Sequence, residues 1–220
     1  MYDPLLDKNL PAHQNYPNSY WAEVSEANNS VKRPVDDGQL ERDITVDVAI
    51  IGGGYTGLST ALHLARNHGI KATILEANRT AWGASGRNAG FILKSSGRKS
   101  YANMQSQWGE AAMRGIYQEM CDGVDTVKNL IAEGIDCDRQ DKGYIRVAHK
   151  PGMLKSLVDA ATLQKQMFGY DIEVLSRQQL HQNYMADQNA YGAIRYQDGF
   201  GINPLKLAWG YQTLAKQAGV

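Results

Sequence analysis

The chain has few of the residues that carry metal, disulfide or membrane chemistry. It contains 2 cysteines and 5 histidines in 220 residues. Cys121 and Cys137 are too far apart for a redox C-x-x-C pair, and the scattered histidines lack metal-ligand spacing, so we expect reduced, structural thiols and no metal centre. No apolar run is long enough to cross a bilayer, and the first residues lack the basic and apolar regions of a signal peptide.

Charge of either sign is not in excess, because 23 Lys and Arg side chains balance 23 Asp and Glu. This balance gives no basic surface for nucleic acid and no reason to expect an anionic membrane as partner. Together with the missing leader and membrane span, it predicts a cytoplasmic protein in a reducing setting. The chain is long enough to bury a core in one or two domains.

Glycine is abundant, with 22 residues, and three of them form a motif. Gly52, Gly54 and Gly57 follow a β-branched segment and precede apolar residues at helical spacing, which is the G-x-G-x-x-G pattern of a dinucleotide-binding turn. The first glycine permits the tight turn, the second lets backbone approach the pyrophosphate, and the third lets helix and strand pack closely. Free N–H groups at Tyr55 and Thr56 then face the anion at the positive end of the helix dipole.

A second expected strand, residues 72–75, ends at Glu76, and Ala77 follows it. Glu76 is at about the separation from Gly52 at which an acidic side chain accepts hydrogen bonds from a ribose diol. The pattern therefore predicts a Rossmann-like βαβ unit that binds a dinucleotide. The alternative is a βαβ unit whose turn is merely tight and whose glutamate is merely solvated.

The segment 77–91 decides which dinucleotide is expected, since it is too rich in glycine and polar residues for a core helix, and its second part, 82–91, forms a motif of its own. With the glycine turn and Glu76, it resembles the FAD-dependent amine and amino-acid oxidoreductases of the D-amino-acid oxidase superfamily, especially the branch that includes gamma-glutamylputrescine oxidoreductase. The resemblance implies that this loop passes beneath the flavin. The matching positions are Ser85, Gly86, Arg87, Asn88 and Gly90. An ordinary surface arginine is the alternative for Arg87.

The resemblance also bears on how FAD is held and on the fold class. Some relatives attach FAD covalently through a histidine in this loop; no histidine lies between His68 and His149, so we predict noncovalent FAD. The implied fold class is α/β, a Rossmann-like FAD-binding βαβ unit with part of an α+β substrate domain inserted. The expected parts are an N-terminal arm (1–43), an FAD-binding region (44–96), a partial substrate domain (97–197) and a helix returning to the FAD domain (198–220).

The chain resembles only the N-terminal part of the family, so we expect the C-terminal half of the fold to be absent. Catalytic residues are expected beyond Val220, and none is assigned. For the full-length family the resemblance implies oxidation of the C–N bond of a small amine or amino acid, with a gamma-glutamylputrescine-like substrate as one option, by hydride transfer to flavin N5. The 220 residues alone are expected to be inactive.

Two alternatives to that function stay open. The first is an NAD(P)-dependent Rossmann dehydrogenase, which uses the same glycine turn but leaves the loop at 83–90 without a role. The second is a non-catalytic, truncated FAD-binding module that a partner chain completes, since an unpaired sheet edge invites pairing.

Residue patterns predict the remaining elements. The arm is expected to be extended and to pack on the body through its aromatic side chains. An apolar stripe over 104–131, including Met104 and Trp108, predicts a long helix with a core face, broken near Gly109 or Gly123. Further elements are predicted as strands at 144–148, 172–175 and 191–196, and helices at 153–168 and 205–218.

Overall fold

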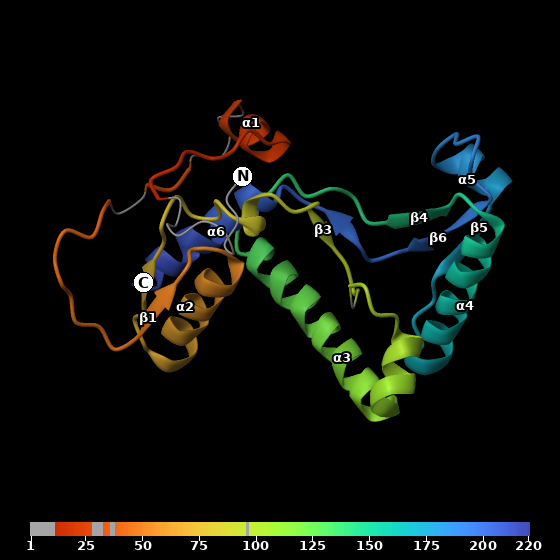
Figure 1. The fold of residues 1–220 in the computed structure, drawn as a ribbon, viewed down its shortest axis with the longest axis horizontal. Coiled ribbons are helices and arrows are strands. Elements are labelled where there is room, and N and C mark those ends of the chain that lie inside the picture. The colour runs from red at the N-terminus through yellow and green to blue at the C-terminus, as the bar shows by residue number, and fades with distance from the viewer. Residues whose placement is uncertain (1–11, 28–32, 36–37, 96) are drawn as a thin grey trace, which may run out of the picture. The chain divides into compact units, whose positions relative to one another are not determined.

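The computed structural model describes residues 12–27, 33–35, 38–95 and 97–220. Parts of the predicted arm, residues 1–11, 28–32 and 36–37, therefore lie outside the described residues. The chain divides into two compact units (Figure 1). Unit 1 comprises Met1–Gly90, Asn129–Arg139 and Ile202–Val220, and unit 2 comprises Phe91–Lys128 and Gln140–Gly201.

Unit 1 contains the predicted βαβ arrangement. Strands β1 (Ala49–Ile51) and β2 (Thr73–Leu75) pair in parallel, and helix α2 (Tyr55–His68) connects them. Gly69 closes α2 in the left-handed conformation, with φ of 69°, as its glycine predicts. The α/β fold class is confirmed, although β1 is shorter than the apolar segment before it suggested.

Helix α6 (Pro204–Gln217) carries much of the core of unit 1. Asn203 caps it, accepting hydrogen bonds from the backbone N–H groups of Leu205 (3.1 Å) and Lys206 (3.2 Å). Trp209 is buried on the helix. The predicted helix at 205–218 is confirmed to within one residue at either end.

The arm is partly helical, which differs from the extended conformation expected for it. Helix α1 (Tyr20–Ala27) begins after Ser19, whose Oγ and carbonyl oxygen accept from the backbone N–H groups of Ala22 (3.3 Å) and Glu23 (3.0 Å). Ala22 is buried, so the helix packs a small apolar face against the rest of unit 1. The sequence signal that was missed is the serine cap.

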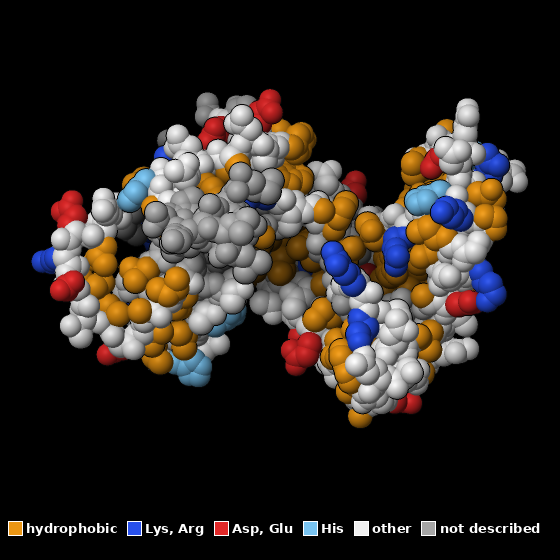
Figure 2. Space-filling view, in the orientation of Figure 1, with side chains coloured by type: hydrophobic (Ala, Val, Ile, Leu, Met, Phe, Trp, Pro, Cys, Tyr) orange, Lys and Arg blue, Asp and Glu red, His pale blue; other side chains and the backbone are white. Residues whose placement is uncertain are grey.

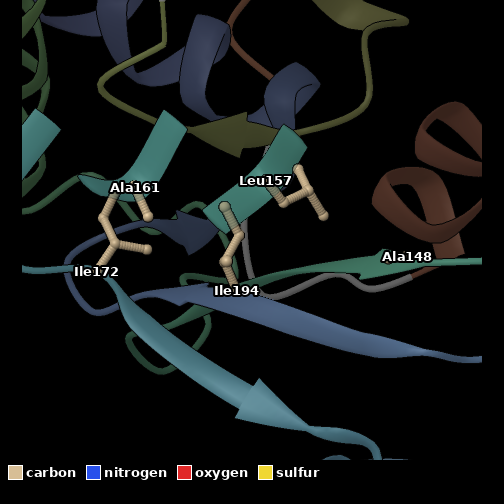
Figure 3. Close-up of a cluster of buried hydrophobic side chains, with 5 residues drawn as sticks. All are labelled: Ala148, Leu157, Ala161, Ile172 and Ile194. Atoms are coloured by element: carbon tan, nitrogen blue, oxygen red, sulfur yellow. The ribbon is translucent and has the colours of Figure 1, made fainter. Parts of the chain in front are cut away.

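Unit 2 is built on an antiparallel sheet in the order β4 (Tyr144–Ala148), β6 (Gly192–Tyr196) and β5 (Glu173–Ser176). Helix α4 (Pro151–Phe168) covers one face of it. Figure 3 shows the apolar side chains between helix and sheet, which are Ala148, Leu157, Ala161, Ile172 and Ile194. Burial of this cluster holds α4 on the sheet.

Short elements complete unit 2. Helix α5 (Arg177–Asn183) begins at Ser176, which forms a capping box with Gln179. Strands β3 (Phe91–Ile92) and β7 (Phe200–Gly201) pair antiparallel. The strands and helices predicted for this region are present, each within about two residues of its expected bounds.

Helix α3 (Tyr101–Ala132) confirms the long predicted helix and its break. Gly109 is non-helical, with φ of 85° and ψ of 166°. The break explains one wrong expectation: Met104 is buried, as its place on the apolar stripe predicts, but Trp108 is 48% exposed. The change of direction at Gly109 ends the first helical segment, so Trp108 does not continue its core face. No helix in the described part of the chain is long and apolar enough to span a bilayer.

Cys137, in unit 1, gives a testable pH dependence. Burial, followed by the negative charges of Asp136 and Asp138, raises the pKa of this thiol from 9.0 to about 11. We expect it to react with a thiol reagent at pH 8 roughly 100-fold more slowly than an ordinary cysteine, as measured by labelling before and after unfolding. Because the folded state keeps the proton that the unfolded state releases, the stability contributed by Cys137 is present below pH 9 and is lost as pH rises towards 11. Fast labelling of both thiols in the folded protein would contradict this.

Candidate cofactor site

The glycine turn between β1 and α2 has the backbone geometry that its sequence predicts. Gly52 has a positive φ of 100°, and its N–H donates to the Leu75 carbonyl oxygen at 2.8 Å. A Cβ added to Gly57 would lie 2.0 Å from the Gly52 carbonyl oxygen and 3.2 Å from Ile50 Cγ2. The first and third glycines are therefore required by the turn and by the close approach of helix to strand.

The N-terminus of α2 presents backbone donors. Gly54 is its N-cap and supplies no side-chain acceptor. The N–H of Tyr55 donates to Ser85 Oγ at 2.9 Å, whereas the N–H groups of Gly54 and Thr56 have no acceptor among the described residues. Such donors at the positive end of a helix suit a phosphate anion, so the residues present fit the pyrophosphate of a dinucleotide.

Glu76 holds the glycine turn from the end of β2. Its Oε2 accepts from the Gly53 N–H at 2.6 Å, and its Oε1 accepts from the Asn78 N–H at 3.0 Å. A carboxylate oxygen has more than one acceptor direction, so these bonds leave capacity for a ribose diol. Gly53 was not assigned a role from the sequence. A Cβ at this position would lie 3.2 Å from Glu76 Cβ, so a larger residue would crowd the Glu76 side chain.

The second loop is stabilised by its own hydrogen bonds. It contains a short 3₁₀ helix, η1 (Ala84–Gly86). Asn88 Oδ1 accepts from the Gly90 N–H at 2.8 Å, and its Nδ2 donates to the Ser85 carbonyl oxygen at 3.0 Å. A Cβ on Gly86 would lie 2.3 Å from the Ala81 carbonyl oxygen, and Gly90 has a φ of 72°. Packing within unit 1 thus already requires both of these glycines.

The two loops contact each other directly. The Tyr55–Ser85 hydrogen bond joins them, and a Cβ on Gly54 would lie 2.8 Å from Ser85 Oγ. The Tyr55 hydroxyl donates to the Pro204 carbonyl oxygen at 2.6 Å, at the start of α6. Burial raises the pKa of Tyr55 well above its ordinary value, which keeps this donor protonated. The structure therefore brings together two motifs that are separated in sequence by helix α2 and strand β2.

Arg87 and Ala77 lie at the edge of this arrangement. Arg87 is exposed; its Nε donates to the Gly83 carbonyl oxygen at 3.3 Å, and its guanidinium carbon lies 4.9 Å from the centre of the Trp82 ring. Ala77 is also exposed, and its carbonyl oxygen accepts from the His13 N–H at 3.0 Å. Arg87 thus has a cation–π contact that orients its side chain.

The arm contributes contacts that the motif argument did not assign. Trp21 Nε1 donates to the Asn88 carbonyl oxygen at 2.8 Å, and the Tyr16 hydroxyl donates to the Thr80 carbonyl oxygen at 2.7 Å. These bonds hold the backbone just before the second loop, at Thr80, and within it, at Asn88. The aromatic residues in an otherwise polar arm were the signal for this packing.

Comparison with known proteins bears on the choice between a flavin and a nicotinamide dinucleotide. A family model described as FAD dependent oxidoreductase, DAO, matches residues 47–220, which is most of the chain. The chain belongs to this family. The match favours FAD over the nicotinamide alternative.

Individual relatives agree with the family. Over 172 residues the chain is 34% identical to gamma-glutamylputrescine oxidoreductase of Escherichia coli strain K12, covering 78% of this chain and 39% of that protein. It is 30% identical over 184 residues to sarcosine oxidase subunit beta of an Arthrobacter species, covering 79% of this chain and 41% of that protein. The chain thus spans about two fifths of the length of these relatives.

Solved structures share the fold at lower identity. Glycine oxidase from Geobacillus kaustophilus matches with a TM-score of 0.60 and 23% identity, over 79% of this chain and 45% of that one. An L-amino acid deaminase from Proteus vulgaris matches with a TM-score of 0.62 and 18% identity, over 84% of this chain and 41% of that one.

No group of three or more His, Cys, Asp and Glu side chains suited to a metal ion occurs within the described ranges.

Proposed function

We propose that the two joined loops of unit 1 hold FAD noncovalently. The observation that carries the proposal is the hydrogen bond from the Tyr55 N–H to Ser85 Oγ, because it places both glycine-containing motifs at the N-terminus of α2. The proposed binding residues are Gly52, Gly54, Tyr55, Thr56, Gly57, Glu76, Ala77, Ser85, Gly86, Arg87, Asn88 and Gly90.

These residues have different proposed roles. The unpaired N–H groups of Gly54 and Thr56 would donate to the pyrophosphate, and Glu76 would accept from the ribose diol. Arg87 would offset phosphate charge with its guanidinium group. Noncovalent binding rests on the absence of histidine between His68 and His149 in the sequence.

For the full-length protein we propose oxidation of the C–N bond of a small amine or amino acid. Bound flavin would accept a hydride at N5 from the carbon beside the nitrogen. The E. coli relative, at 34% identity, supports a gamma-glutamylputrescine-like substrate, and the sarcosine oxidase relative supports a secondary amine. Because the chain spans about two fifths of these relatives, we propose that the catalytic side chains lie outside the 220 residues.

Glu76 provides the sharpest test of cofactor binding. We expect the purified chain, mixed with FAD and desalted, to retain flavin absorbance, and Glu76→Gln to weaken FAD binding by roughly 10- to 100-fold, because a charged acceptor is lost while the side-chain shape is kept. Asp47→Asn is the matched control, since it removes one negative charge from an exposed position before β1. Flavin titration followed by desalting measures both.

Two outcomes would count against the proposal. Equal FAD affinity in both variants would show that Glu76 does not contribute to binding. A colourless protein that NAD stabilises would instead support a nicotinamide-dependent enzyme. Acid precipitation tests the mode of attachment separately: flavin in the supernatant agrees with noncovalent binding, and flavin in the pellet contradicts it.

A further inference from the structure

A row of hydrogen bonds joins the arm to residues 77–90, which include most of the second loop. Three arm residues donate to this segment in sequence order: the His13 N–H to the Ala77 carbonyl oxygen (3.0 Å), the Gln14 N–H to Asn78 Oδ1 (2.8 Å) and the Tyr16 hydroxyl to the Thr80 carbonyl oxygen (2.7 Å). Asn15 accepts in return, its Oδ1 from Arg79 Nη2 (2.9 Å) and its carbonyl oxygen from Trp82 Nε1 (2.9 Å). The arm therefore lies beside this segment and runs in the same direction.

Trp82 connects the arm to a residue of the proposed cofactor site. Its indole N–H donates to the Asn15 carbonyl oxygen, and the guanidinium carbon of Arg87 lies 4.9 Å from the centre of its ring. A ring that is fixed at its edge by a hydrogen bond offers Arg87 a defined surface. The arm thus helps to orient the guanidinium group that is proposed to offset phosphate charge.

Trp21 makes a second connection, further along the loop. Its Nε1 donates to the Asn88 carbonyl oxygen at 2.8 Å, and a Cβ added to Gly90 would lie 3.1 Å from its Cζ2. The side chain of Asn88 in turn donates to the Ser85 carbonyl oxygen at 3.0 Å, and Ser85 Oγ accepts from the Tyr55 N–H. Contacts therefore continue from Trp21 to the N-terminus of α2.

The arm is also fixed to α6, which does not belong to the loop. Ser25 is 3% exposed, and its Oγ accepts from Nδ2 of Asn203, the residue that caps α6, at 2.9 Å. Trp209 Nε1 donates to the Tyr16 hydroxyl at 3.0 Å. The arm therefore bridges a core helix of unit 1 and the second loop.

Several of the bonds between arm and loop are accessible to solvent. Those of Gln14, Trp21 and Trp82 are exposed, so each adds only modestly to stability. Helix α1 lies on the outside of unit 1 (Figure 1), and Figure 2 shows acidic and hydrophobic side chains at the surface there. An outer segment of this kind opens locally at lower cost than the core that it covers.

We propose that the arm, through residues 13–25, is a positioning element of the cofactor site. Its docking fixes the conformation of residues 77–90, and bound FAD in turn holds the arm in its docked position. Trp21 is the main positioning residue, because it contacts both Asn88 and Gly90. The inference rests on the proposed FAD site. Since coupling between two sites is reciprocal, arm docking and FAD binding strengthen each other by the same factor.

Hydrogen exchange of the 220-residue chain, followed by mass spectrometry, tests the first half of the proposal without FAD. Trp21→Ala removes both the ring and the indole donor, and Trp21→Phe removes the donor alone. We expect Trp21→Ala to accelerate exchange in residues 77–90 about 10-fold and to leave α2 unchanged. Trp21→Phe should restore part of the protection.

Addition of FAD tests the coupling. FAD should slow exchange in residues 13–25 as well as in 77–90, and Trp21→Ala should weaken FAD binding about 10-fold in a flavin titration. Trp21→Phe should weaken it less. Trp108→Ala is the matched control, since it removes a half-exposed tryptophan from unit 2, and it should change neither the exchange in 77–90 nor the FAD affinity.

The outcomes separate this inference from the proposed FAD site. Retention of FAD by Trp21→Ala with unchanged affinity and unchanged exchange in residues 77–90 would overturn the role of the arm and leave the FAD site standing. Faster exchange throughout unit 1, including α2, would show that the arm only stabilises the fold. A parent chain that retains no FAD would contradict the FAD site and, with it, the coupling.

Discussion

Replacing Gly57 by alanine is expected to destabilise unit 1 by about 3 kcal/mol, although alanine is the better helix former. The new Cβ would lie 2.0 Å from the Gly52 carbonyl oxygen, a distance that no rotamer change can relieve because both atoms are fixed to backbone. Helix α2 must therefore move away from β1, and the N–H groups at its start move with it. Chemical unfolding and retention of FAD should both decline.

Gly115→Ala is the matched control, since it is the same substitution on another helix. Gly115 is exposed on α3, and nothing lies within 4 Å of an added Cβ. Alanine there should stabilise the protein by about 0.5–1 kcal/mol, through helix propensity alone. Because the two substitutions are expected to change the stability in opposite directions, the comparison separates the steric clash at Gly57 from the effect of alanine on helix propensity. A Gly57→Ala variant as stable as the parent would mean that helix and strand have room to separate without cost.

Local signals predicted the elements that depend on nearby residues. The turn at Gly52, the end of α2 at Gly69 and the break at Gly109 all follow from backbone conformations that glycine adopts readily. The capped helix after Ser176 is likewise readable, because cap and helix are adjacent in the chain. The cofactor motifs were found in the same way, from glycines at a fixed spacing.

Features that depend on distant residues were not predicted. The segment before Gly52 suggested a strand from residue 44, yet β1 contains only Ala49–Ile51, since a strand extends only where a neighbour supplies hydrogen bonds and β2 has three residues. The side chain of Ile51 is 82% exposed, so the β-branched pattern overstated burial as well. The hydrogen bond between the Tyr55 N–H and Ser85 Oγ could not be predicted either, because the spacing of residues in a motif does not show which side chain contacts a helix N-terminus.

Asp138 and Lys206 form the pair with the second large expected effect. Lys206 has no exposed side-chain surface, and its Nζ donates to Asp138 Oδ1 at 2.7 Å. Asp138→Asn should cost about 3–5 kcal/mol in urea unfolding, because it leaves a buried ammonium group without its counter-ion. Asparagine keeps the side-chain shape and tolerates the positive φ of 51° at this position, but it has one acceptor oxygen where Asp138 uses two, so the hydrogen bond from Asn203 Nδ2 to Asp138 Oδ2 (3.2 Å) is lost together with the charge.

The reverse substitution should cost much less. Lys206→Met removes the buried charge itself, and the Asp138 side chain, which is 38% exposed, can be hydrated, so we expect a loss of about 1 kcal/mol. The double variant should therefore be more stable than Asp138→Asn alone. Glu133→Gln, which breaks the exposed pair with Arg66, is the surface control, and its effect should be small and sensitive to salt. Equal losses for Asp138→Asn and Lys206→Met would show that the hydrogen bond, rather than the cost of burying an unpaired charge, stabilises this part of unit 1.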